Sequence, residues 1–483
     1  MARNPTPNRA SQAEAVPTLE RRLGPFDAAA IIVSNVIGGG ILFTPPLVAA
    51  TIPHPWLFLG VWAVGGALAF MGAMAYAELA ALRPRAGGEY VDLRAAFGNM
   101  AAFLSGWTSF VAGFSGAIAA SSVFLAIYLD RFIPGAGDAT PLFTIPVPLV
   151  PLVFSRQALV ALATIVLMSW IHLRGVGPGR LMGNILATLK VLALLMFIAL
   201  GLSFGAGSTA NLQQSGAVPV SMAAWLLALI PVMFAYSGWN AAAYIAEEIR
   251  DPGRNVPRAL ALGTAAVIAV YVLLNLLYLF VLPVGELAKV KGSVLDVIAD
   301  RLLNQMAGNV MGLVSIISLA ASISANVFAG PRVYFAMARD GLFLQTASRI
   351  HPRFKTPAAA IVAQAIWSGL LVLTGSGSAL TTYTGFSVIL FAGVAVAALF
   401  VLRQRDPDAA RPFRALGYPI APAIFTIASA LIVANALWND LFVPMQTGAP
   451  WGPAAAGLLI IGVGVPIYFL FANRTVKPVV RGS

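Results

Sequence analysis

The sequence of 483 residues is 59% hydrophobic and only 10% charged, and its mean hydropathy is +0.85. A water-soluble protein of this composition would expose far too much apolar surface, so the composition excludes the soluble classes and predicts a membrane protein. The sequence contains no cysteine, which excludes disulfides, thiolate metal sites and cysteine nucleophiles. The net charge of +12 fits basic loops at a lipid surface, and no basic stretch interleaved with aromatic residues predicts a nucleic-acid partner.

Apolar runs of about 20 residues, the length that crosses a bilayer as a helix, recur about twelve times along the chain. They predict an all-α membrane protein with twelve transmembrane helices. The predicted spans are residues 27–50, 57–82, 99–129, 157–173, 181–204, 222–246, 258–282, 308–338, 357–374, 380–402, 418–442 and 453–472.

The distribution of lysine and arginine predicts the orientation, because cytoplasmic loops accumulate both. With the N-terminus inside, the inner tails and loops carry 24 of the 30 basic residues and the outer loops carry five. Both termini are therefore predicted to be cytoplasmic, with tails over 1–25 and 474–483. We expect an integral protein of the plasma membrane, which is the inner membrane in a bacterium, in contact with anionic membrane lipids.

The remaining basic residue, Lys190, lies inside a predicted span. It is roughly 15 Å along the helix from Arg180, near the middle of a hydrocarbon core about 30 Å thick. A charged group at this depth usually faces the interior of the bundle and has a function. We interpret Lys190 as a coupling residue whose ammonium contacts carbonyls where the first span is interrupted. A purely structural lysine is the alternative.

Two predicted spans are interrupted by small residues in mid-run. Gly38, Gly39 and Gly40 interrupt the first span, and free N–H groups at the start of the resumed helix suit a carboxylate. The segment 234–240, Phe-Ala-Tyr-Ser-Gly-Trp-Asn, interrupts the sixth span, and its unwound carbonyls suit an ammonium. Such a pair indicates a transporter's binding site, here for an α-amino acid. For the three glycines, close helix packing is the alternative.

The site between the breaks is predicted to be neutral, because no acidic residue lies near either break within its span. The histidines, His54, His172 and His351, lie at predicted span ends or in loops and lack the spacing of metal ligands. The spans also offer no paired acids or activated serine of the kind an enzyme needs. We therefore expect neither an enzyme nor a bound metal or cofactor.

Motifs along the chain carry a family resemblance. They are Asn35-Val-Ile-Gly-Gly-Gly-Ile41, Ala77-Glu-Leu79, Gly87-Gly-Glu-Tyr90, Ala96-Phe-Gly98, Phe234-Ala-Tyr-Ser-Gly-Trp-Asn240, Glu247-Glu-Ile-Arg-Asp-Pro-Gly-Arg-Asn255, Arg332-Val-Tyr-Phe-Ala-Met-Ala-Arg-Asp-Gly341 and Arg411-Pro-Phe-Arg414. From about residue 24 to 470, the chain resembles the L-type amino-acid transporters of the amino acid, polyamine and organocation superfamily. The resemblance implies a LeuT-like fold with helices 1 and 6 unwound, inverted five-helix repeats over 26–205 and 221–404, and two peripheral helices within 417–473.

The same resemblance implies roles for single residues. Backbone amides of the three glycines would bind the substrate carboxylate, and carbonyls of Val36, Phe234 and Ser237 would bind its amino group. Lys190 falls where many relatives keep a lysine in place of a sodium ion, with Ser324 as its expected hydroxyl partner. The implied substrate-binding residues are Val36, Gly38, Gly39, Gly40, Phe234, Ser237, Trp239 and Asn240.

Departures from the family pattern bear on substrate and partner. Gly39 stands where serine is common, and Ser237 stands where glycine is common, which favours a small to medium neutral substrate over a large aromatic one. Animal relatives pair with a glycoprotein subunit through a cysteine. Because this chain has none, we expect no disulfide-linked accessory subunit.

Charged residues after the second break form a predicted inner gate. Glu247 and Glu248 are followed by Arg250 and Arg254, and ion pairs among them would hold the inner path shut until it opens. A solvated helix end with a capped turn is the alternative.

The predicted function is sodium-independent transport of neutral L-amino acids by alternating access, with exchange of one amino acid for another as the leading mode. A proton-coupled importer that uses Lys190 is one alternative. A sensor that binds an amino acid without transporting it is the other.

Overall fold

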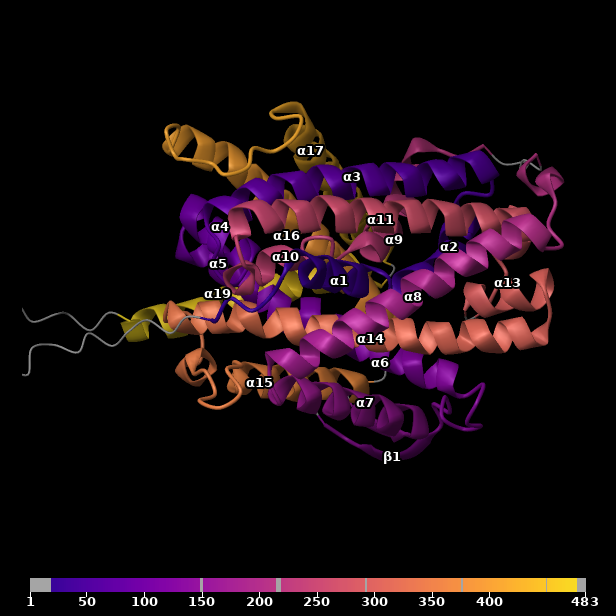
Figure 1. Cartoon of the computed structure of the whole chain (residues 1–483), viewed down its shortest axis with the longest axis horizontal. Helices are drawn as coiled ribbons and strands as arrows, with labels where there is room; N and C mark the ends of the chain where they lie inside the picture. Colours follow the sequence, from indigo (N-terminus) through magenta and orange to yellow (C-terminus); the bar gives the residue numbers. More distant parts are fainter. Residues whose placement is uncertain are drawn as a thin grey trace, which may run out of the picture.

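The computed structural model describes residues 19–147, 151–213, 219–291, 293–374, 377–448 and 450–475. Most of the two predicted tails, residues 1–18 and 476–483, lies outside these ranges. The described chain is almost entirely helical, and its long helices run side by side along the longest axis of the molecule (Figure 1).

Nine helices of the described chain are long and apolar enough to cross a membrane. One of them, over Asn99–Leu129, joins α5 (Asn99–Thr108), a π-helical turn and α6 (Phe114–Leu129). The others are α3 (Pro55–Leu82), α7 (Arg156–Leu173), α8 (Val176–Phe204), α11 (Pro252–Val281), α14 (Gln305–Arg339), α16 (Gly377–Arg405), the run from α17 (Ile420–Leu437) to α18 (Val443–Thr447), and α19 (Pro453–Thr475).

A tenth candidate is the pair α1 (Pro25–Val36) and α2 (Gly39–Thr51), which are bent by 40° at their junction. Two shorter apolar helices, α9 (Met222–Tyr236) and α15 (Ala358–Leu373), lie where the sixth and ninth spans are predicted. The structure thus confirms a helical membrane protein, with nine or ten long apolar helices among the described residues. The twelve-span inverted repeat stays a prediction.

The first break separates α1 from α2. Pro25 opens α1, where a missing N–H costs nothing, and the Asp27 carboxylate accepts the Gly24 N–H at 2.7 Å. Helical geometry is lost at Ile37 and Gly38, and Gly38 has φ −146° and ψ −143°. The chain therefore presents unpaired backbone groups in the middle of an apolar run, as the three glycines predict.

The second break separates α9 from the one-turn helix α10 (Ala241–Tyr244). Gly238 sits between them with φ +98°, a conformation that strongly favours glycine. A short 3-10 turn, Ala246–Glu248, follows α10, and Asp251 with φ +45° leads into α11. Both predicted interruptions are thus present as breaks in helical geometry.

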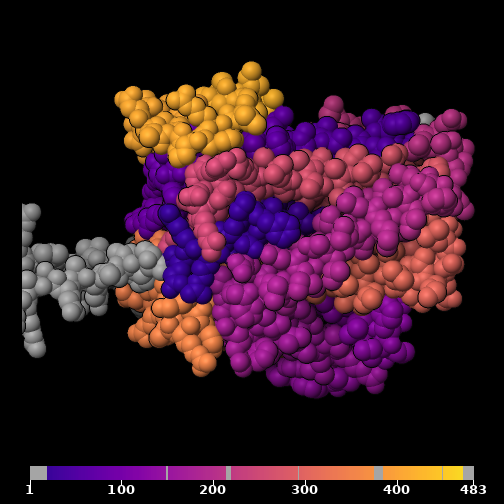
Figure 2. Space-filling view, in the orientation of Figure 1, coloured from indigo at the N-terminus to yellow at the C-terminus, as the bar shows by residue number. Residues whose placement is uncertain are grey.

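Burial distinguishes the central helices from the peripheral ones. In the most apolar stretch of α14, 72% of residues are buried, against 28% in the α17–α18 run and 22% in α19. The first broken helix packs against α8, α11 and α14, and α1 lies among them in Figure 1. The gold surface around α17 stands at the edge of the molecule (Figure 2).

The two ends of the bundle differ in their connecting elements (Figure 1). One end carries α4 (Glu89–Phe97), which is not among the candidate spans, and we term it the N-terminal face. The opposite face carries α12 (Val284–Leu287) and the amphipathic α13 (Val294–Leu302). A two-stranded antiparallel sheet, β1 (Pro141–Ile145) with β2 (Leu152–Ser155), and short turns at Thr209–Leu212 and Gln345–Ser348 complete the described elements.

Candidate functional site

The two breaks face a common cavity of about 90 Å³. Other parts of its wall come from α4, the 99–129 helix, α14 and α16. Pairs of interrupted helices that enclose a cavity are the binding-site geometry of many transporters. Seven of the predicted binding residues line this cavity: Val36, Gly38, Gly39, Gly40, Phe234, Ser237 and Asn240.

The glycines of the first break are held against their neighbours without room for side chains. A Cβ atom on Gly40 would lie 2.5 Å from Cα of Ala235, and one on Gly38 would lie 2.8 Å from Oγ of Ser322. Because α2 begins at Gly39, its first N–H groups have no partner within the helix. The positive end of the α2 dipole and these free donors therefore meet at the cavity.

Lys190 lies at the first break, where its side chain is fully buried. Its Nζ donates to the carbonyl of Ser34 at 3.1 Å and to that of Ile37 at 2.5 Å. These carbonyls belong to the last turn of α1 and to the break, where intrahelical partners run out. The lysine therefore joins α8 to the unwound segment by two charge-assisted hydrogen bonds.

Ser324 does not meet Lys190, contrary to the expected pairing. Its Oγ shares a hydrogen bond of 2.9 Å with Nε2 of His172, a contact between α14 and α7. Ser322 lies two residues earlier on α14, about half a helical turn away, and it reaches the break, where its Oγ lies 3.5 Å from the carbonyl of Asn35. The preferred hydroxyl partner was therefore assigned to the wrong face of α14.

Tyr271 on α11 links the two breaks, and sequence reasoning missed it. Its buried hydroxyl lies 2.7 Å from the carbonyl of Val36 and 3.0 Å from that of Ala235. The carbonyl of Val36, one of the predicted ammonium ligands, thus already accepts from a protein donor. A single tyrosine in a long apolar run gives no signal of this contact.

Trp239 lies outside the cavity wall, although it was placed among the binding residues. Its ring packs edge-on against Tyr76 and Phe425, with centroids 4.9 and 5.8 Å away. The positive φ of Gly238 turns the chain, and Trp239 packs on α3 and α17. Its side chain supports the second break from behind.

Glu89 lines the cavity, so the expectation of a site without acidic residues is wrong. It is the first residue of α4, and the hydroxyl of Tyr76 donates to its Oε2 at 2.8 Å. Nδ2 of Asn240, in the second break, lies 3.5 Å from the same oxygen. The expectation rested on the two interrupted spans, whereas Glu89 reaches the site from the connecting helix α4.

A family model now identifies the class of protein. The model described as "Amino acid permease" matches residues 23–465, nearly the whole chain. This chain belongs to the amino acid permease family. The permease is accordingly an integral membrane protein of the amino acid, polyamine and organocation superfamily, a family of transporters and not of enzymes.

Curated relatives are similar to the permease over most of their length. "Large neutral amino acids transporter small subunit 2" of Homo sapiens is 30% identical over 471 residues, 95% of this chain and 82% of that protein. "Asc-type amino acid transporter 1" of Homo sapiens is 29% identical over 466 residues, covering 95% and 84%. "b(0,+)-type amino acid transporter 1" of Mus musculus is 29% identical over 474 residues, covering 96% and 92%. These relatives support amino acid transport as the permease's activity.

The N-terminal face of the permease is held by ion pairs to α14. Glu248 and Arg332 pair at 2.7 Å with both side chains 1% exposed, and Glu247 pairs with Arg339 at 3.1 Å. Arg250 and Arg254 are exposed, and neither has an ion pair within the described chain. The predicted arginine partners were therefore wrong, because the left-handed turn at Asp251 leads the chain away from the acids into α11.

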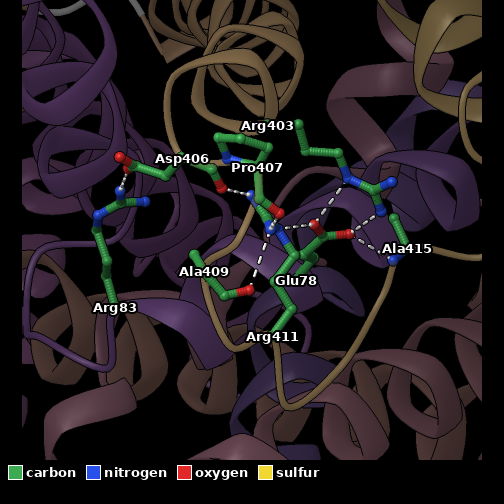
Figure 3. Close-up of polar contacts among 8 residues, drawn as sticks. All are labelled: Glu78, Arg83, Arg403, Asp406, Pro407, Ala409, Arg411 and Ala415. Atoms are coloured by element: carbon green, nitrogen blue, oxygen red, sulfur yellow. Dashed lines mark hydrogen bonds and ion pairs between the residues drawn. The ribbon is translucent and has the colours of Figure 1, made fainter.

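A second buried acid on the same face, Glu78 of α3, forms ion pairs with two arginines (Figure 3). Arg403 of α16 donates to both carboxylate oxygens at 2.9 and 2.6 Å, and Nε of Arg411 lies 3.1 Å from Oε1. The backbone N–H of Ala415 also donates to this carboxylate, at 2.6 Å. This cluster joins α3 to α16 and to the segment that leads into α17.

Proposed function

We propose that the permease exchanges small to medium neutral L-amino acids across the plasma membrane without sodium. The observation that carries this proposal is the cavity between the two breaks, with free backbone donors on one side and unwound backbone on the other. An α-amino acid carries opposite charges on two groups attached to the same carbon atom, and the backbone groups of such a cavity can bind both.

The first break would bind the substrate carboxylate at the amides of Gly38, Gly39 and Gly40. The start of α2 supports this assignment, because its N–H groups are free and its dipole favours an anion. The amino group would lie near the carbonyls of Val36, Phe234 and Ser237. The rings of Phe124, Phe234 and Phe391 in the cavity wall favour a compact side chain over a large aromatic one.

Lys190 would replace a coupling sodium ion. Its ammonium already occupies a position between two carbonyls of the first break, and a second cation there would be repelled. A fixed charge cannot dissociate as a bound ion does. The expected consequence is a carrier whose cycle depends on a second amino acid rather than on a sodium gradient.

The proposed cycle is alternating access in a twelve-span LeuT-like arrangement, with repeats over 26–205 and 221–404 and peripheral helices within 417–473. The N-terminal face would be cytoplasmic, with both termini on that side. Its Glu247–Arg339 and Glu248–Arg332 pairs would then form the inner gate and break as the inner path opens.

The permease would act without a disulfide-linked subunit. The printed name of one relative describes it as a small subunit. This chain has no cysteine with which to form such a link. Amino acids and membrane lipids are therefore its proposed partners.

Counterflow in proteoliposomes tests the proposal. Liposomes preloaded with an unlabelled neutral amino acid should accumulate external labelled amino acid, whereas empty liposomes should not. Unlabelled competitors should identify small to medium neutral amino acids as substrates. Binding without any transport would contradict the proposal, as would uptake into empty liposomes driven by a pH gradient.

A further inference from the structure

Glu89 differs from every other glutamate of the described chain. Each of the others pairs with an arginine, and these pairs are Glu20–Arg22, Glu78–Arg403, Glu247–Arg339, Glu248–Arg332 and Glu286–Arg301. Glu89 has no basic side chain within 4.0 Å in the part of the chain that the structure describes. Its side chain is nevertheless buried, with the residue only 7% exposed.

The donors around Glu89 are all neutral. The hydroxyl of Tyr76 on α3 donates at 2.8 Å, and that of Ser105 on α5 lies 3.4 Å from Oε1. Asn240 of the second break approaches Oε2, and the same amide donates to the hydroxyl of Tyr244 on α10 at 3.0 Å. The carboxyl group therefore connects three helices and the break through hydrogen bonds without charge compensation.

A second acid adds to the cost of ionising Glu89. Asp92 lies one turn further along α4, is 2% exposed and also has no ion pair among the described residues. Two buried carboxylates this close repel each other. Burial raises the pKa of Glu89, and the hydrogen bond from Tyr76 only partly opposes this rise. The positive charge of Arg83 opposes the rise in the pKa of Asp92.

A buried acid without a cation is stable in one of two ways: it holds a proton, or it pairs with a charge on a ligand. A hydroxyl group can accept as well as donate, so Ser105 can take the one hydrogen bond that a neutral carboxylic acid donates, while Tyr76 and Asn240 donate to the acid. The position of Glu89 in the cavity wall gives it access to water whenever the cavity opens.

We propose that Glu89 is a proton-binding site of the substrate cavity, protonated while the N-terminal face is closed and able to lose its proton when water enters. Loss of the proton would destabilise the closed state through an unpaired buried charge. Because each exchange cycle returns through a closed state, exchange would slow as the pH rises. This proposal rests on the exchange activity proposed above and adds proton regulation to the same site.

The pH dependence of exchange tests the proposal with Glu89→Gln, an isostere that stays neutral. Exchange by the unsubstituted permease, at equal pH on both sides, should fall by up to about tenfold per pH unit above the pKa of Glu89. E89Q should show a flat profile. The matched control E286Q, on the opposite face, should keep the original profile, and an E89Q profile identical to it would overturn the proposal.

Infrared spectroscopy provides a test that needs neither transport nor a variant that folds. Protein with 13C-labelled glutamate should show a protonated carboxylic acid band at neutral pH, because the other described glutamates are paired with arginine. Absence of this band would refute the proton site even if exchange is measured. Competition by lysine or arginine that disappears in E89Q would also refute it, by showing that Glu89 binds a ligand cation. Loss of all counterflow with the band present would instead refute the exchange function.

Discussion

The two breaks of the permease are alike in backbone and opposite in their partners. The first meets a side-chain amine, since Lys190 donates to the carbonyls of Ser34 and Ile37. The second meets an acid, since its Asn240 lies near the carboxyl group of Glu89. A lysine held by the chain cannot leave, whereas a proton on a carboxyl group can. The first break is thus suited to keeping one geometry, and the second is suited to regulation by a proton on Glu89.

Tyr271 joins these two regions through one hydroxyl group near the carbonyls of Val36 and Ala235. Displacement of either break would disturb this contact. The first break also depends on Lys190, and the second is followed by the buried Glu248–Arg332 ion pair. The two breaks meet where Gly40 lies against Ala235.

The largest expected effect follows from Lys190→Ala. Two charge-assisted hydrogen bonds to the first break would be lost, at about 1.5–3 kcal/mol each, so exchange should fall by about a hundredfold or more. Counterflow rates measure this loss. Lys289→Ala, at an exposed lysine of the opposite face, is the control and should retain the original rate. A K190A rate close to that of K289A would show that the first break needs no cation.

The next effect concerns the buried ion pair between Glu248 and Arg332, which follows the second break. Arg332→Ala would leave Glu248 buried without its partner, and we expect a loss of about 3–5 kcal/mol in the free energy of unfolding. Arg250→Ala removes an exposed arginine and should stay within about 0.5 kcal/mol. Denaturation of both variants in detergent gives the two values. Equal losses of unfolding free energy in the two variants would show that the buried ion pair stabilises the protein no more than the exposed arginine does.

A smaller effect is expected from Gly40→Ala. Its Cβ would lie 2.5 Å from Cα of Ala235, so the two broken helices would have to separate, at about 1–3 kcal/mol. Gly60→Ala on α3 meets nothing within 4 Å and should instead be neutral or stabilising by up to about 1 kcal/mol. Thermal unfolding distinguishes the two variants. If G40A unfolds no earlier than G60A, the breaks do not pack as closely as described.

A further effect is a pH dependence of stability from Asp92. Burial raises the pKa of this carboxyl group from 3.8 to about 7, against the opposing effect of Arg83. Because the folded protein binds this proton more tightly, the stabilisation is complete below the ordinary pKa and disappears as the pH rises through about 7. The Tm should therefore fall over this interval, and Asp92→Asn should flatten the decrease. Asp138→Asn, at a partly exposed carboxylate outside α4, should leave it unchanged.

Much of the fold follows from the sequence, because long apolar runs and mid-run glycines have few other solutions in a bilayer. Gly38 to Gly40, Phe234 and Ser237 carried enough local signal to be placed at one cavity before the structure was known. Trp239 supports the second break instead of lining the cavity, because the turn at Gly238 directs its ring toward α3 and α17. Ser324 was misplaced because the sequence does not give the rotation of α14 about its axis. Glu89, Tyr271 and Arg332 reach the site or its gate from other helices. A local sequence pattern does not indicate such contacts.

If Lys190 performs at the first break the role of a bound sodium ion, exchange needs no sodium. Amino acid counterflow into preloaded liposomes, with sodium replaced by choline on both sides, measures this directly. We expect the same exchange rate in sodium and in choline. An exchange rate that rises with sodium and saturates would contradict it, because it would reveal an ion site that the lysine does not fill.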